Sequence, residues 1–149
     1  MATKKRDSGA DDAPSLAVLL SEASRRASAE FERVLSPEGL PVDQWRVLEQ
    51  LADGRGLTMT ALADELDVKL PALSKLIDRM AGGALVQRAQ DPADQRRVLV
   101  YVSDLGLEKH RQLRDRVRRT RRDLEQRLGD ERGRALRRLL QDFLRDPAR

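Results

Sequence analysis

The sequence contains no cysteine, one histidine, and only four Phe, Trp and Tyr residues among 149. Without cysteine the chain can form no disulfide and do no thiol chemistry, which is typical of proteins of the reducing cytoplasm. The single histidine, His110, cannot build a His-based zinc cluster within one chain. No apolar run approaches the roughly 18 residues that a membrane helix needs. We therefore expect a cytoplasmic protein without a metal site or a membrane span.

Motifs of enzyme chemistry are also missing from the sequence. It has no phosphate-binding P-loop and no Gly-x-Gly-x-x-Gly pattern after a strand. Asp and Glu number 25, but no spacing singles out one pair for acid–base catalysis. We expect no catalytic activity and no cofactor.

Positive charge is concentrated in the last third of the chain. Residues 108–149 carry 15 Lys and Arg against 8 Asp and Glu, whereas residues 1–107 have a net charge of −3. A basic surface favours nucleic acid as a partner. An Arg-rich helix is more often just a solvated face, so charge alone leaves both interpretations open.

Periodic apolar residues predict a mainly helical chain. After a polar segment at 1–14, which we expect to be a disordered tail, apolar residues recur every three or four positions between Leu16 and Val34. Short helices are expected at about 42–52, from Thr58 or Thr60, and from Pro71 to Gly82. Two further helices should begin after Ser103 and after Gly129.

The period changes to that of strands between residues 85 and 102. Leu85-Val86 and the β-branched run 98–102 predict two strands, and 91–95 is rich in turn-forming residues. Two short helices, a tight turn and then a hairpin form a winged helix-turn-helix pattern. The expected fold class is therefore mainly α with a small β-hairpin wing and a helical dimerisation region.

The fourth helix is the expected reader of DNA bases. Its apolar residues Leu73, Leu76, Ile77 and Met80 should face the core. The remaining face is short, polar and partly basic, and suits a major groove about 12 Å wide. We expect DNA contacts from Lys69, Ala72, Ser74, Lys75, Asp78 and Arg79. A solvated helix face would have the same composition.

The predicted wing carries a basic tip. Arg96 and Arg97 follow an Asp-Pro-x-Asp turn, and arginine is favoured in a narrow minor groove by its negative potential. Asp94 could orient Arg96 by a charge-assisted hydrogen bond. Arg97 and Arg88 are expected to contact phosphates or to support the wing. An ordinary charged β-turn is the alternative.

Residues 40–106 resemble the MarR family of bacterial regulators. The resemblance is carried by Val42-Asp43-Gln44-Trp45-Arg46-Val47-Leu48, by 73–80, and above all by Asp91-Pro92-Ala93-Asp94-Gln95-Arg96-Arg97 leading to Val102-Ser103-x-x-Gly106. The sequence departs from the family pattern in four places. The recognition helix usually starts with Ser or Thr, where this chain has Lys69-Leu70-Pro71. Ala72 stands in place of the usual Thr, Ala84 in place of Gly and Gln95 in place of Arg. These departures concern base contacts and not the fold.

The resemblance implies a sequence-specific, nucleoid-associated regulator of transcription, most often a repressor. It implies a winged helix-turn-helix domain at 40–103 and a helical dimerisation region at 15–38 and 104–146. A homodimer should bind a palindromic operator in double-stranded DNA. Apolar stripes of the terminal helices should meet across the twofold axis through Leu16, Leu20, Phe31, Leu113, Leu124, Leu136, Leu140 and Phe143. The rival interpretation is a coiled-coil adaptor protein without specific DNA binding.

Regulation by a small molecule is a further expectation. Without cysteine the chain cannot sense oxidants through thiols, and the common remaining mode in the family is an aromatic or phenolic anion bound between the DNA-binding lobe and the dimerisation helices. Trp45 could supply the apolar wall and His110 the polar anchor. Each could equally be a packed structural residue.

Overall fold

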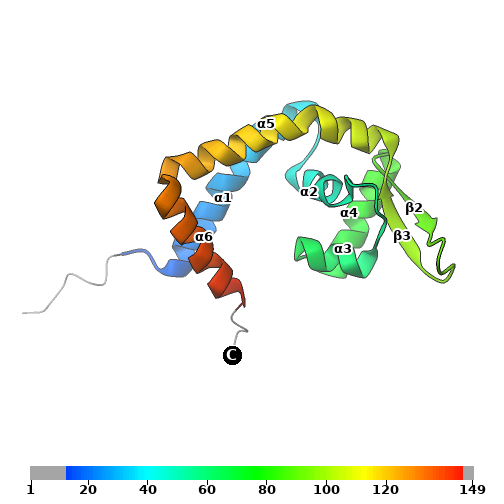
Figure 1. The fold of residues 1–149 in the computed structure, drawn as a ribbon, viewed down its shortest axis with the longest axis horizontal. Helices are drawn as coiled ribbons and strands as arrows, with labels where there is room; N and C mark the ends of the chain where they lie inside the picture. The colour runs from blue at the N-terminus through cyan, green and yellow to red at the C-terminus, as the bar shows by residue number, and fades with distance from the viewer. Residues whose placement is uncertain (1–12, 146–149) are drawn as a thin grey trace, which may run out of the picture.

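The computed structural model describes residues 13–145, so most of the expected tail at 1–14 and residue 146 lie outside the described part. Helices dominate, and a small sheet follows the fourth α-helix (Figure 1). The expected fold class is confirmed. The elements are α1 (Leu16–Leu35), the 3₁₀ helix η1 (Ser36–Glu38), α2 (Val42–Leu51), β1 (Leu57–Thr58), α3 (Met59–Leu66), α4 (Leu70–Gly82), β2 (Val86–Gln90), β3 (Val98–Val102), α5 (Asp104–Leu128) and α6 (Asp130–Arg145).

Hydroxyl side chains begin three of the helices. Ser15 accepts a hydrogen bond from the backbone N–H of Val18 at 3.4 Å, and Thr58 accepts one from Ala61 at 3.2 Å. Ser103 accepts the N–H of Gly106 at 2.9 Å. Each bond satisfies a backbone donor that the first helical turn leaves without a partner. Thr58 is therefore the residue that starts the third α-helix.

The sheet has three antiparallel strands in the order β1-β3-β2. β2 and β3 form the predicted hairpin, with Val86 opposite Val102 and Gln90 opposite Val98. β1 pairs with the inner part of β3, where Leu57 faces Val100. The sequence did not predict β1, because two residues are too few to show the alternation of a strand.

The hydrophobic core lies within the winged lobe and extends to the first half of α5. It contains Trp45 and Leu48 of α2, all four predicted inward residues of α4, and Val100 of β3. α5 contributes Leu113 and Val117, each 2% exposed. Leu113 is thus already covered within its own chain, and its expected place in the dimer interface stays a prediction.

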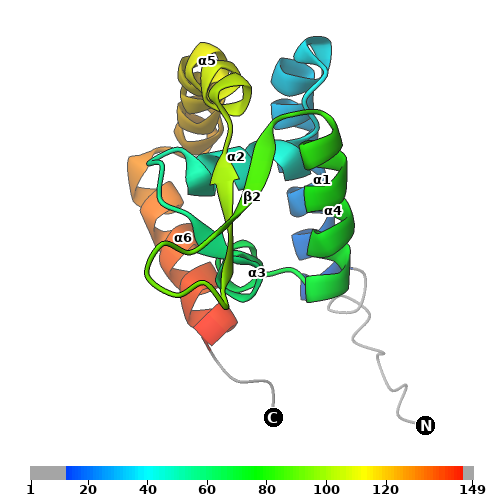
Figure 2. The same ribbon diagram turned by 90° about the vertical axis from the view of Figure 1, so that its right-hand side faces the viewer.

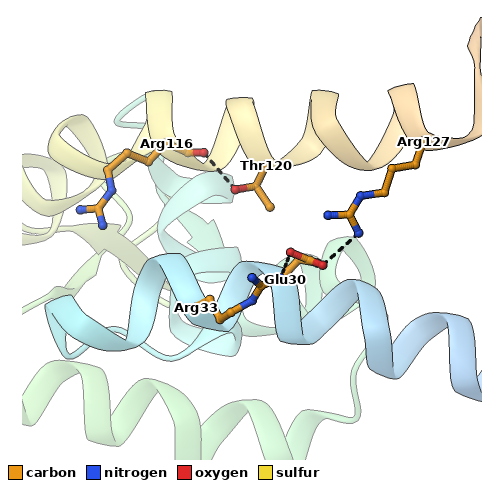
Figure 3. Close-up of polar contacts among 5 residues, drawn as sticks. All are labelled: Glu30, Arg33, Arg116, Thr120 and Arg127. Atoms are coloured by element: carbon orange, nitrogen blue, oxygen red, sulfur yellow. Dashed lines mark hydrogen bonds and ion pairs between the residues drawn. The ribbon is translucent and has the colours of Figure 1, made fainter.

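Helix α5 crosses above the winged lobe, and α1 packs against α5 and runs obliquely down from it (Figures 1 and 2). Arg127 of α5 donates to Glu30 of α1 at 3.0 Å, and Glu30 also pairs with Arg33 on its own helix (Figure 3). Arg116 donates to Glu38 at 2.8 Å, and the hydroxyl of Thr120 donates to the Arg116 carbonyl at 3.2 Å. These contacts tie α1 and η1 to the middle and end of α5.

Helix α6 folds down from the end of α5 that is remote from the wing (Figure 1), and it carries no buried residue. Large apolar side chains of α1 and α6 are exposed, among them Leu16 at 63%, Leu136 at 42% and Phe143 at 59%. Leu20, Phe31, Leu124 and Leu140 are partly buried. In the described part of the chain, no helix is both long and apolar enough to cross a membrane.

Candidate nucleic-acid interface

The outward face of α4 is formed by the residues that the core does not use. Pro71 stands in the first turn, and Leu73, Leu76, Ile77 and Met80 are buried. Because these four residues occupy one face, the other face is left to solvent on the side of the molecule seen in Figure 2. It presents Lys69, Ala72, Lys75, Asp78 and Arg79 as exposed residues and Ser74 as a half-buried one.

Two aspartates shape the tip of the wing. Asp91 Oδ1 accepts the N–H of Ala93 at 2.9 Å, and Asp94 Oδ1 accepts the backbone N–H of Arg96 at 3.0 Å. The Asp94 carbonyl also accepts the N–H of Arg97. The expected bond from Asp94 to the Arg96 guanidinium is replaced by one to the Arg96 backbone, because an aspartate in a turn reaches the amide two residues on. Asp94 fixes the turn and not the side chain.

An ion pair joins the wing to the recognition helix. Arg88 of β2 donates to Asp78 of α4 at 2.7 Å. Asp78 therefore orients a basic neighbour on the wing, Arg88. Because β2 and α4 are held together, their positions relative to a DNA duplex are coupled.

Other cations of this surface differ in how far they are neutralised. Arg97 lies 3.8 Å from Asp91, and Arg79 lies 3.7 Å from Asp43 at the start of α2. Within residues 13–145, Lys69, Lys75 and Arg96 form no ion pair. Lys69 and Lys75 on the helix and Arg96 at the wing tip are thus available to pair with an anion outside the chain.

A tight junction connects α4, the wing and α5. Ala84 has a φ of 57°, the left-handed conformation that glycine adopts most readily. The Ser103 hydroxyl donates to the Ala84 carbonyl at 2.5 Å and caps α5 through Gly106. A Cβ on Gly106 would lie 2.1 Å from the Leu85 carbonyl oxygen. The base of the wing is therefore held directly against the first turn of α5.

A pocket of about 410 Å³ lies between α1, α2 and α5. Phe31, Trp45 and Val117 supply apolar parts of its wall. His110 is not among its lining residues; it stacks on Trp45 with 4.9 Å between ring centroids. Burial lowers the pKa of His110, Glu49 opposes this shift, and Arg114 and Arg118 add to it. Of the two expected effector residues, the structure places only Trp45 at the pocket.

Comparison with known proteins identifies the chain. A sequence model of the MarR family matches residues 38–97, from η1 to the wing tip. The MarR family transcriptional regulator SPO1453 of Silicibacter pomeroyi is 31% identical, with 87% of this chain and 94% of that chain covered and a TM-score of 0.73. The chain belongs to the MarR family. It is thus a DNA-binding transcriptional regulator and not an enzyme.

Two other similar proteins are named as repressors, and one of them was solved with DNA. The homoprotocatechuate degradative operon repressor of Escherichia coli is 25% identical over 130 residues, which cover 87% of this chain and 88% of the relative. The repressor CouR, solved bound to a 23-mer DNA duplex, is 26% identical with a TM-score of 0.78, and 88% of this chain and 93% of CouR are covered. The family domain in this chain contains both α4 and the wing tip.

The sequence did not single out three polar residues of the pocket. Arg46, Glu49 and Arg121 line it beside Trp45. Arg46 lies within the motif that carried the MarR resemblance, but Glu49 and Arg121 are 72 positions apart and form their ion pair only through the fold. Spacing along one helix could have shown that Trp45 and Glu49 share a face, and nothing in the sequence links them to Arg121.

Proposed function

We propose that this MarR-family regulator is a homodimeric repressor that binds a palindromic operator through α4 and the wing. The observation that supports the proposal is the pair of cations, Lys75 and Arg96, that are exposed without an ion pair to the described residues, on two elements joined by Arg88 and Asp78. Cations that are left available can donate to the acceptor atoms of base edges and pair with the phosphates of DNA.

In the proposed complex α4 lies in the major groove. Lys75 donates to guanine, and Arg79, one helical turn further along α4, supports this contact. Ser74 and Ala72 contact neighbouring bases. A specific base contact of this kind contributes about 1–3 kcal/mol of discrimination. Lys69, at the N-cap of α4, contacts the phosphate backbone near the start of the helix. Asp78 keeps Arg88 directed along the phosphates and makes no base contact itself.

The wing supplies the second contact in this proposal. Arg96 enters the minor groove, where it is favoured by the narrow groove's potential. Arg97, held near Asp91, contacts a phosphate or supports the tip. Two recognition helices of a dimer then lie about one DNA turn apart, roughly 34–36 Å, and the operator spans about 16–20 base pairs.

Dimerisation is proposed through the regions 15–38 and 104–146. The exposed apolar residues Leu16, Leu136 and Phe143, with the partly buried Leu20, Phe31, Leu124 and Leu140, form the surface to be covered. Apolar surface stabilises an interface by about 25 cal/mol per Å² removed from water, so leaving these side chains exposed disfavours the separated chain. We place the dimer in the bacterial cytoplasm, on the nucleoid.

Relief of repression is proposed to come from a small aromatic or phenolic anion in the pocket that Trp45 lines. The volume of about 410 Å³ lies within the range of small-molecule sites, roughly 300–1,000 Å³. The relative from Escherichia coli is named as the repressor of an operon that degrades homoprotocatechuate, an aromatic acid. Release by a hundredfold requires about 2.7 kcal/mol of differential binding between the two states.

Selection of bound sequences from random DNA, followed by a footprint, tests this function. We expect a palindrome with two protected half-sites, and loss of the sequence preference in Lys75→Ala. A matched control is Arg119→Ala on α5, away from α4 and the wing. Binding without sequence preference, or binding unchanged in Lys75→Ala, would contradict the assignment of α4.

A further inference from the structure

One ion pair links the winged lobe to α5 at the edge of the pocket. The guanidinium of Arg121 on α5 donates to Glu49 Oε1 on α2 at 3.1 Å, and both side chains line the pocket. Among the described residues it is the ion pair that joins α2 to α5. Both side chains remain partly exposed, 53% for Arg121 and 39% for Glu49. Such pairs contribute little to stability, so another carboxylate can replace Glu49 without unfolding the chain.

The wall of the same pocket is largely apolar beside this ion pair. Phe31, Trp45 and Val117 line it, and Trp45 is 3% exposed. The Nε1 of Trp45 is the buried side-chain nitrogen or oxygen of the described residues that has no hydrogen-bond partner, although buried polar groups almost always have one. Apolar walls beside an arginine fit an aromatic carboxylate.

The pocket also reaches the segment before the recognition helix. Arg46 lines it, and its guanidinium donates to the carbonyl of Leu66 at 2.7 Å. Leu66 is the last residue of α3, four residues before α4 begins. An anion in the pocket therefore attracts one arginine that is bonded to α2 and another that holds the end of α3.

We propose that Glu49 is a built-in substitute for the effector's carboxylate. In the chain without effector, Glu49 occupies Arg121 and ties α2 to α5; an aromatic carboxylate takes its place on Arg121, repels Glu49, and opens this link. This inference rests on the proposed function, which supplies the aromatic anion as effector, and adds the residue that the effector displaces. α2 of the winged lobe and α5 of the dimerisation region also share the hydrophobic core, so opening the link does not free the lobe. It shifts α2 relative to the middle of α5 and in this way lowers operator affinity.

Three variants of the full chain test the substitution. Glu49→Gln removes the competing charge and keeps the shape, Arg121→Gln removes the cation, and Arg119→Gln is the control, an exposed α5 arginine outside the pocket. The probes are 4-hydroxyphenylacetate and salicylate, each compared with its neutral amide. Binding is read from the fluorescence of Trp45, the one tryptophan of the chain, and operator affinity from fluorescence anisotropy on the selected DNA site.

We expect at least one acid to bind wild type and to release the operator. Its neutral amide should bind at least about tenfold more weakly. Glu49→Gln should bind that acid several-fold more tightly and should hold the operator more weakly than wild type without any acid. Arg121→Gln should lose about tenfold in affinity for the acid and little for the amide. Arg119→Gln should match wild type in every measurement.

Three outcomes would overturn the inference. They are binding of neither acid at millimolar concentration, equal binding of acid and amide, and equal acid binding by Arg121→Gln and wild type. Unchanged operator affinity in Glu49→Gln would show that the ion pair of Glu49 and Arg121 is not coupled to DNA binding. In all these cases specific operator binding by wild type would leave the proposed DNA-binding function standing, whereas absence of any specific site would contradict that function first.

Discussion

Replacing Gly106 by Ala should damage the junction between the wing and α5. The added Cβ would lie 2.1 Å from the Leu85 carbonyl oxygen, 3.0 Å from Val102 Cγ2 and 3.1 Å from Leu48 Cδ2. An ordinary C···O contact is about 3.3–3.6 Å, so backbone must move by about 1 Å. The same carbonyl accepts the N–H of Ser103 at 3.0 Å, and Ser103 caps the N–H of residue 106. Movement therefore strains two hydrogen bonds.

The expected loss of stability follows from this packing. Overpacking costs about 1–3 kcal/mol, and two weakened hydrogen bonds cost about 1 kcal/mol each. Alanine has a higher helix propensity than glycine, and this offsets about 1 kcal/mol of the loss. Gly106→Ala should thus lower the free energy of unfolding by about 2–4 kcal/mol, a large part of the stability of about 5–15 kcal/mol that is usual for a domain.

Urea unfolding followed by circular dichroism measures this loss, with protein concentration held fixed because a dimer's stability depends on it. Gly82→Ala at the end of α4 is the matched control, since a Cβ there meets no atom within 4 Å. That variant should be neutral or slightly stabilised. A Gly106→Ala protein within about 0.5 kcal/mol of wild type would refute the described packing of α5 on the wing base.

Three further predictions concern the wing, the turn before it and the half-buried histidine. Arg96→Ala should weaken operator binding more than Arg97→Ala and remove protection at the outer edges of the footprint, because Asp91 already partly neutralises Arg97; an unchanged footprint would exclude Arg96 from the minor groove. Ala84→Gly should raise the free energy of unfolding by up to about 1 kcal/mol, because it removes left-handed backbone strain that outweighs the entropy it adds to the unfolded chain. A lower melting temperature than that of wild type would contradict this. Burial lowers the pKa of His110 in the folded chain, so the unfolded chain takes up the proton first as pH falls through about 6.5. Stability should be full above that pH and fall below it, and His110→Gln should reduce this part of the pH dependence; an unaltered profile would be the contrary result.

Much of the fold could be predicted because its elements carry local signals. The inward residues of α4 recur at helical spacing, the hydroxyl caps precede their helices, and the run 98–102 is typical of a strand. The outward face of α4 follows by subtraction, so the candidate DNA residues could be named. The strand β1 could not, since two residues form a strand only when β3 provides the partner.

The interactions that depend on three-dimensional packing were not predictable. Leu113 has the spacing of an interface residue, yet its own lobe covers it. Asp94 bonds the backbone of Arg96 because turn geometry places the amide nearer than the guanidinium. The pairing of Glu49 with Arg121 joins helices far apart in sequence, and the two residues taken for a joint effector site stack on each other instead. Helical spacing shows which face a residue occupies and not which element covers that face.

A footprint of the full chain on its selected DNA site, with the stoichiometry of the complex, tests the central claim most directly. We predict two chains per duplex and two half-sites related by a twofold axis about one DNA turn apart. Lys75→Ala should abolish protection of the guanines within each half-site, and Arg96→Ala should abolish protection at the outer edges. One chain per duplex, or a footprint that neither substitution changes, would contradict the account.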